Sequence, residues 1–269
     1  MTDRYSNLFQ ELKRRQQTAF VPFVTLHDPD FDRSLEIIQC LIDNGADALE
    51  LGIPFSDPIA DGPVIQKASI RALQSHSTVS RSFEIIEKIR AKNPEIPIGL
   101  LVYSNLVVAN GMDHFYSLAA QAKVDSVLIA DVPILEADPF ISAAKSAGIK
   151  PIFIATPNAS DEMLKQVAEK SEGYTYLLSR AGVTGTEVKA EMPVENIVSA
   201  LQKYSAPPSL LGFGISTPEQ VEQAIKLNIG GVISGSAVVK IIQDNLANQS
   251  ALIEQLSSFV RKMKQATNQ

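Results

Sequence analysis

The sequence predicts one α/β domain over residues 1–269, a single (β/α)8 TIM barrel of eight parallel strands. Short apolar runs rich in β-branched residues alternate with amphipathic stretches, and no linker, charge block or low-complexity segment divides the chain. The runs are continuously apolar, which is typical of parallel strands buried on both faces. We expect strands at residues 19–25, 48–52, 97–103, 124–130, 150–154, 173–178, 209–213 and 231–234.

The helices of the first half are predicted by apolar stripes and by length. Residues 4–15 indicate an extra N-terminal helix that can cover the bottom of the barrel. Residues 61–91 are too long for one crossover helix and predict two, inserted after the second strand. The stripe after the first strand, which a glycine ends, consists of Leu35, Ile38, Leu41, Ile42 and Gly45.

The helices of the second half carry start signals. Residues 217–220 match a capping box with proline at the first helical position. A short helix is expected to start near Ser236, and a final helix behind a Ser250 cap, as insertions after the eighth strand. The apolar stripe of that final helix consists of Leu252, Ile253, Leu256, Phe259, Val260 and Met263.

An open doubly wound sheet is the alternative architecture. It predicts a glycine-rich fingerprint directly after the first strand. Residues 21–29 contain no glycine, so the closed barrel is favoured.

Composition limits the classes of partner and compartment. With 45% hydrophobic residues the chain can form a core, yet its longest apolar runs, such as residues 97–103, fall far short of the roughly 18 residues that a membrane span needs. A net charge of −6 without a basic patch argues against nucleic acid as the main partner. The N-terminus has no signal-peptide core, and the single cysteine, Cys40, permits no intrachain disulfide. We therefore expect a soluble cytoplasmic protein, with Cys40 in its core.

Glu50 is the first candidate for chemistry. It lies in the second strand between apolar residues, where burial of a charge is costly and raises the pKa of a carboxyl group. A raised pKa suits a general acid/base that works near neutral pH. The alternative is a structural glutamate paired with a buried Arg or Lys.

The loop that follows, residues 53–63, contains two further acids. Asp57 and Asp61 either face the site or serve as turn and helix N-cap residues, the more usual role of Asp before Pro or Gly.

Glycine and serine turns follow the last two strands. Residues 212–216 and 235–237 let the backbone approach a ligand closely, and the helix near Ser236 would direct N–H groups to the same point. This is the usual phosphate site of such barrels, although Gly/Ser turns also occur by chance in α/β proteins.

The long loop after the sixth strand, residues 179–189, suggests a lid that excludes water, with a flexible surface loop as the alternative. The three histidines, His27, His76 and His114, are scattered, and no cluster has metal-ligand spacing. We therefore predict no metal site.

Together these segments resemble the alpha subunit of tryptophan synthase nearly end to end, from YSNLF at 5–9 to FVRKM at 259–263. Two departures are His27 before Asp28-Pro29, where the family pattern has Gly, and Ala181, where serine is frequent. The most specific matching segments are AFVPFVT (19–25), LELG (49–52), PFSDP (54–58), ADGP (60–63), PIGLL (97–101), YTYLLSR (174–180), GVTG (182–185), GFGIS (212–216) and GSA (235–237).

The resemblance implies a lyase that cleaves indole-3-glycerol phosphate to indole and D-glyceraldehyde 3-phosphate in tryptophan biosynthesis. By the same resemblance, Glu50 moves protons to indole C3 and from the glycerol hydroxyl, and Asp61 faces the indole N–H. Thr184 matches the lid threonine that orders Asp61. The implied substrate contacts are Phe23, Leu101 and Phe213 around the indole, Tyr176 beside the substrate, and Gly185, Gly214, Gly235 and Ser236 at the phosphate.

The resemblance also implies a partner. A separate beta chain would carry pyridoxal phosphate, receive the indole and form an alpha2beta2 complex, while this chain would need no cofactor. Phe55 is expected to be exposed for that contact. The implied interface residues are Pro54, Phe55, Asp57, Tyr103 and Asn105.

Two other functions are kept as alternatives. A sugar-phosphate isomerase or epimerase would have polar or smaller residues in place of Phe23, Leu101 and Phe213. A non-catalytic activator of a beta-type partner would not need both Glu50 and Asp61, so their presence argues against it.

Overall fold

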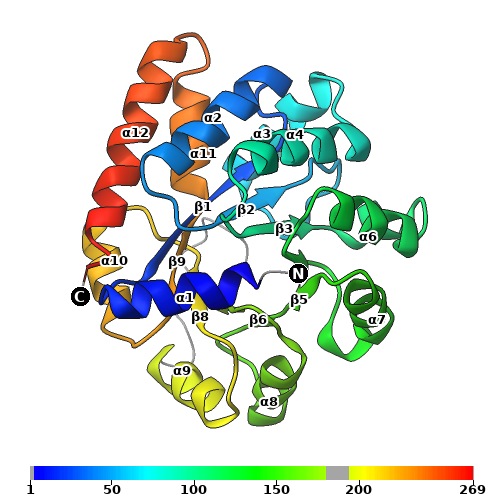
Figure 1. Ribbon diagram of the computed structural model, residues 1–269, viewed down its shortest axis with the longest axis vertical. Coiled ribbons are helices and arrows are strands. Elements are labelled where there is room, and N and C mark those ends of the chain that lie inside the picture. The colour runs from blue at the N-terminus through cyan, green and yellow to red at the C-terminus, as the bar shows by residue number, and fades with distance from the viewer. Residues whose placement is uncertain (1–2, 180–193, 269) are drawn as a thin grey trace.

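Parallel strands form a ring at the centre of the molecule (Figure 1). The computed structural model describes residues 3–179 and 194–268, and over these it has nine strands in the order β5-β4-β3-β2-β1-β9-β8-β7-β6. Only Phe153 separates β5 from β6, so the chain itself closes the ring. The strands are β1 (Ala19–Thr25), β2 (Leu49–Gly52), β3 (Ile98–Val102), β4 (Ser126–Ile129), β5 (Lys150–Ile152), β6 (Ile154–Ala155), β7 (Thr175–Leu178), β8 (Ser209–Gly212) and β9 (Gly231–Ser234).

Helices surround this ring, as Figure 1 shows. They are α1 (Arg4–Arg14), α2 (Phe31–Asp43), α3 (Pro63–Gln74), α4 (Val79–Lys92), α5 (Ser104–Val108), α6 (Met112–Gln121), α7 (Asp138–Ser146), α8 (Asp161–Lys170), α9 (Val194–Lys203), α10 (Pro218–Ile225), α11 (Ser236–Asp244) and α12 (Gln249–Gln265), with a 3-10 turn η1 (Ile134–Glu136).

The TIM-barrel prediction is confirmed, and two of its details differ in the structure. The strand expected at residues 150–154 is interrupted at Phe153. The capping box of α10 is present, since Thr217 and Gln220 each accept from the other's backbone N–H. The expected Ser250 cap is wrong: the carboxamide of Asn248 accepts from Ala251 N–H and starts α12 two residues earlier, because Asn also caps helices well.

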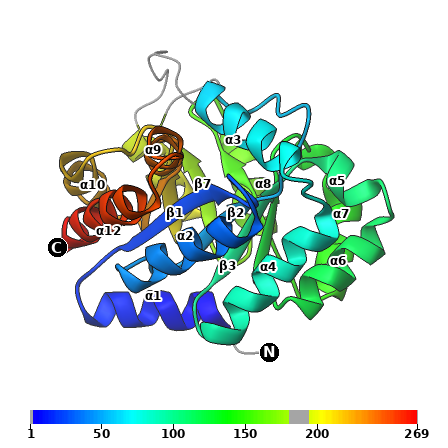
Figure 2. The ribbon, with the colours of Figure 1, turned by 90° about the horizontal axis from the view of Figure 1, so that it is seen from above.

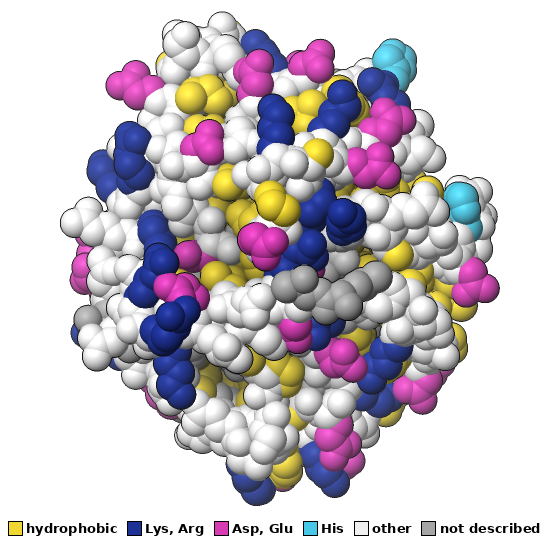
Figure 3. Space-filling view, in the orientation of Figure 1, with side chains coloured by type: hydrophobic (Ala, Val, Ile, Leu, Met, Phe, Trp, Pro, Cys, Tyr) yellow, Lys and Arg dark blue, Asp and Glu magenta, His cyan; other side chains and the backbone are white. Residues whose placement is uncertain are grey.

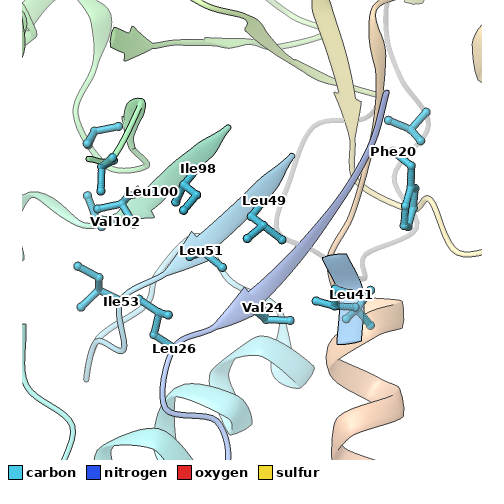
Figure 4. Packing of buried hydrophobic residues seen from close by; sticks show 14 of the residues in the cluster. Phe20, Val24, Leu26, Leu41, Leu49, Leu51, Ile53, Ile98, Leu100 and Val102 are labelled. Atoms are coloured by element: carbon cyan, nitrogen blue, oxygen red, sulfur yellow. The ribbon is translucent and has the colours of Figure 1, made fainter. Parts of the chain in front are cut away.

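Side chains of the strands divide into an outer and an inner layer. Figure 4 shows Phe20, Val24, Leu49, Leu51, Ile98 and Leu100, which belong to the cluster between strands and helices. Because successive side chains of a strand point to opposite faces, the residues between them point inward. Phe23, Glu50 and Gly99 are register partners on β1, β2 and β3, so they share the inner side.

Helix α1 covers the end of the barrel at which the strands begin (Figure 2). Tyr5 and Leu12 of α1 join the inner cluster, and Tyr5 shares a 2.8 Å hydrogen bond with Ser126. Arg4 and the buried Arg90 each form a 2.8 Å ion pair with Asp125. Within the described residues, α1 therefore closes this end of the barrel.

Charged side chains of both signs are interspersed on the face that α1 covers, without a large field of one sign (Figure 3). Across residues 3–179 and 194–268, every helix is too short or too polar to cross a membrane.

Candidate active site

A cavity of about 770 Å³ lies at the carboxyl ends of the strands. Thr184 and Gly185 lie outside the described residues, as does most of the loop predicted to be a lid. All the other residues predicted to act on or bind substrate line this cavity: Phe23, Glu50, Asp61, Leu101, Tyr176, Phe213, Gly214, Gly235 and Ser236. The fold therefore brings together residues that are up to 213 positions apart in the sequence.

Glu50 is 1% exposed and lies on the inner face of β2. The hydroxyl of Tyr174 donates to its Oε1 at 3.0 Å. Burial raises the pKa of Glu50 to about 8, with a smaller rise from the charge of Asp61 and a decrease from the Tyr174 hydrogen bond. Within residues 3–179 and 194–268 no Lys or Arg forms an ion pair with Glu50, so the structural alternative has no partner there. A pKa of about 8 favours the protonated form of this carboxyl group at neutral pH.

Asp61 lies in the loop between β2 and α3. The hydroxyl of Tyr103 donates to its Oδ2 at 3.0 Å and accepts from the N–H of Ala60 at 3.1 Å. Burial raises the pKa of Asp61 to about 6, and the Tyr103 hydrogen bond opposes the rise. The N-cap of α3 is Gly62, so Asp61 does not have the capping role that was its alternative. At neutral pH these values favour an ionised Asp61 beside a protonated Glu50, and such a divergent pair suits an electrostatic stabiliser and an acid.

Much of the cavity lining is apolar. Phe23, Leu101 and Phe213 line the cavity together with Leu128 and Ile154. A flat aromatic ring can bury its faces against such a wall, whereas a sugar would leave its hydroxyl groups without partners.

The buried ring of Tyr176 depends on a glycine in the next strand. A Cβ at Gly212 would overlap the hydroxyl and ring carbons of Tyr176. Gly212 therefore makes the space in which Tyr176 stands beside the cavity.

The start of α11, directly after β9, also lines the cavity. Helix α11 begins at Ser236 with Gly235 as its N-cap and without a side-chain cap. The first N–H groups of a helix have no intrahelical acceptor and carry partial positive charge. Gly214 lines the same cavity, and a helix start of this kind can bind an anion.

Two tyrosines were not recognised as site residues from the sequence. In the sequence Tyr174 is only part of a matching segment, and Tyr103 is only a predicted interface residue. Tyr103 is 3% exposed, and its hydroxyl contacts Asp61, so its side chain belongs to the site. No pattern of residue types marks such contacts, because they join segments 42 and 124 positions apart.

The expectation that Phe55 is exposed is wrong. Its ring is half-buried and stacks on Tyr103, with 5.2 Å between ring centroids. Pro54 is buried, whereas Asp57 and Asn105 are exposed. Exposed apolar side chains in these two segments include Ile59, at 75%, and Val108, at 43%.

Known proteins match the whole chain. The family model described as tryptophan synthase alpha chain matches residues 9–268. A tryptophan synthase alpha chain of Vibrio cholerae is 60% identical over 98% of this chain and 99% of its own, and one of Francisella tularensis is 58% identical over 99% of each.

Solved structures of tryptophan synthase chains also align with this chain. The alpha subunit of tryptophan synthase from Legionella pneumophila aligns with a TM-score of 0.89 and 28% identity over 99% of both chains. A chain from the tryptophan synthase complex of Pyrococcus furiosus aligns with a TM-score of 0.81 and 33% identity, covering 92% of this chain and 98% of that one.

Proposed function

Because the chain belongs to the tryptophan synthase alpha chain family, it is a lyase that cleaves indole-3-glycerol phosphate to indole and D-glyceraldehyde 3-phosphate, and we propose that Glu50 and Asp61 divide the acid/base and electrostatic work of this reaction. The observation that carries the proposal is that both carboxyl groups line one cavity with pKa values of about 8 and about 6.

Glu50 acts as the acid. Its proton adds to indole C3, which weakens the bond from C3 to the glycerol carbon because the ring can no longer be aromatic. When that bond breaks, its electrons return to the indole ring and the adjacent hydroxyl of the glycerol carbon becomes an aldehyde. The hydroxyl proton passes to the carboxylate of Glu50, which is restored to its acid form. A positioned acid/base group of this kind contributes about 10²–10⁴-fold to rate.

Asp61 stabilises the intermediate. Protonation at C3 places positive charge on the indole nitrogen, and the ionised Asp61 offers it an opposite charge within a largely apolar cavity. Electrostatic interactions are stronger where water is excluded, so this carboxylate lowers the barrier without moving a proton itself. Tyr103 holds the carboxylate in place through its 3.0 Å hydrogen bond.

Substrate binding uses the apolar wall of the cavity and the backbone around the start of α11. The apolar wall of Phe23, Leu101 and Phe213 receives the indole, and Gly214, Gly235 and Ser236 receive the phosphate. Thr184 and Gly185 complete this set by resemblance, outside the described residues.

A separate beta chain is the proposed partner, in an alpha2beta2 complex. The neighbouring structures of tryptophan synthase complexes support it. The predicted interface residues Pro54, Phe55, Asp57, Tyr103 and Asn105 belong to two segments joined by the ring stack of Phe55 on Tyr103. The exposed Ile59, in the same loop as Pro54 and Asp57, adds apolar surface. We propose that pyridoxal phosphate belongs to the beta chain, that this chain needs no cofactor, and that the complex acts in the cytoplasm.

The test is indole release from indole-3-glycerol phosphate by the full chain, with and without a beta chain. We expect release by the chain alone and faster release in the complex. A sugar-phosphate isomerase would release no indole, and a non-catalytic activator would stimulate the beta chain without cleaving the substrate. The Asp61→Asn variant should keep its affinity for glycerol 3-phosphate and lose most of the cleavage rate.

A further inference from the structure

The backbone leaves the sheet abruptly after β8. The last register pairs of β8 are Leu178↔Gly212 on one side and Leu211↔Val232 on the other. Phe213 and Gly214 then adopt φ angles of 66° and 82° in succession. This left-handed conformation is rare for a residue with a side chain, so the turn needs support from its surroundings.

Two serine hydroxyls supply that support from opposite sides. Ser179, directly after β7, donates to the carbonyl of Phe213 at 3.0 Å. Ser234, the last residue of β9 and 0% exposed, donates to the carbonyl of Ile215 at 2.7 Å. The hydroxyls therefore replace the ladder hydrogen bonds that the turn has given up, one on each flank of β8.

The residues beyond the turn are held independently. The N–H groups of Ser216 and Thr217 donate to Oε1 of Gln220 at 2.8 and 3.1 Å, as part of the start of α10. The stretch between the end of β8 and this cap, residues 213–215, is the part whose carbonyls the two serines hold.

That stretch is part of the cavity. Phe213, Gly214 and Ile215 all line it, as do Gly235 and Ser236 at the start of α11. The Ser234 hydrogen bond in addition joins the loop after β8 to the residue before Gly235, so it ties the two halves of the proposed phosphate cradle together.

We propose that Ser179 and Ser234 are positioning residues for the substrate phosphate: their hydroxyls hold the Phe213–Gly214 turn in the conformation that presents the Gly214 N–H to the phosphate and the Phe213 ring to the indole. The proposal rests on the proposed function. Neither serine touches the substrate, and both act through the backbone of residues 213–215.

The test uses Ser179→Ala and Ser234→Ala in the full chain, with Ser179→Thr as the variant that keeps a hydroxyl. Loss of one hydrogen bond should raise the KM for indole-3-glycerol phosphate and the Kd for glycerol 3-phosphate about three- to tenfold. The kcat should change less than about twofold, because Glu50 and Asp61 are untouched. Ser179→Thr should have a KM close to the wild-type value. The double alanine variant should have a higher KM than either single alanine variant.

Ser82→Ala is the matched control. Ser82 is buried, and its hydroxyl also donates to a carbonyl, that of Thr78 at 3.0 Å, but in α4 outside the cavity. Like Ser179→Ala and Ser234→Ala, this variant should lower Tm. Unlike them, it should leave the KM and the glycerol 3-phosphate Kd unchanged.

The proposal is overturned if both alanine variants bind glycerol 3-phosphate as the wild type does, or if Ser179→Thr fails to restore a raised KM. Calorimetry with glycerol 3-phosphate does not require turnover. A wild type that binds this probe but releases no indole would therefore refute the catalytic assignment, while the serine variants would still support or overturn the positioning role.

Discussion

Tyr174→Phe removes the hydroxyl that donates to Glu50 and leaves the ring in place. Tyr174 is buried in the inner layer, and its hydroxyl is 3.0 Å from Glu50 Oε1. This hydrogen bond favours the ionised carboxylate over the neutral acid, since bonds to charged groups are worth about 1.5–3 kcal/mol and neutral ones about 0.5–1.5 kcal/mol. Its removal should therefore raise the pKa of Glu50, in the same direction as burial does.

The midpoints of these two ranges differ by about 1.3 kcal/mol, which corresponds to about one pH unit. The basic limb of the pH profile should move from about 8 in the wild type to about 9 in the variant. At pH 9 the protonated fraction of Glu50 would rise from about 10% to about 50%, so the variant should be about fivefold faster relative to its own maximum. At pH 7 the two relative rates should be nearly equal.

The assay is kcat/KM for indole release between pH 5 and 10, which reports ionisations of the free enzyme. Tyr116→Phe is the control, because Tyr116 is a buried tyrosine of α6 in the outer layer. A basic limb that stays in place, or moves downward, in Tyr174→Phe would refute the assignment of that limb to Glu50.

Three further perturbations test the rest of the site. Gly235→Asp should raise the KM at least about tenfold by charge repulsion. Gly235→Ala is the control: its Cβ would meet Phe23 at an ordinary 3.5 Å, so its KM should stay near the wild-type value. An unchanged KM in the aspartate variant would place the phosphate elsewhere. Gly212→Ala should displace the ring of Tyr176, raise the KM and lower the free energy of unfolding by about 1–3 kcal/mol. Denaturant unfolding that matches the wild type would contradict this packing. Ile59→Ser should leave Tm unchanged and weaken beta-chain binding about tenfold, as measured by calorimetry. An affinity equal to that of the wild type would exclude Ile59 from the interface.

The strands and helices could be predicted because their signals are local. Continuous apolar runs, a capping box and a length too great for one helix each depend on neighbouring residues, and all three predictions are confirmed. The Ser250 cap failed for a local reason as well, since Asn248 offers an equally good acceptor two residues earlier.

The site could be predicted as a set of residues but not as a set of contacts. Glu50 was singled out as a carboxyl group in an apolar strand, and its burial follows from the alternation of side chains on β2. Its partner Tyr174, the partner of Asp61 and the burial of Phe55 all depend on segments that meet only in the closed barrel. The serines that hold the turn after β8 are of the same kind, because their role is visible only as two hydroxyls bonded to carbonyls of a neighbouring loop.

The most direct test of the account is the rate of indole release by Glu50→Gln. The amide keeps the shape of the side chain and can still accept from Tyr174, but it cannot supply a proton. We expect the rate to fall at least about 10²-fold, with the Kd for glycerol 3-phosphate, measured by calorimetry, within about twofold of wild type because the phosphate cradle is untouched. A Glu50→Gln variant that releases indole at the wild-type rate would show that the proton comes from another group.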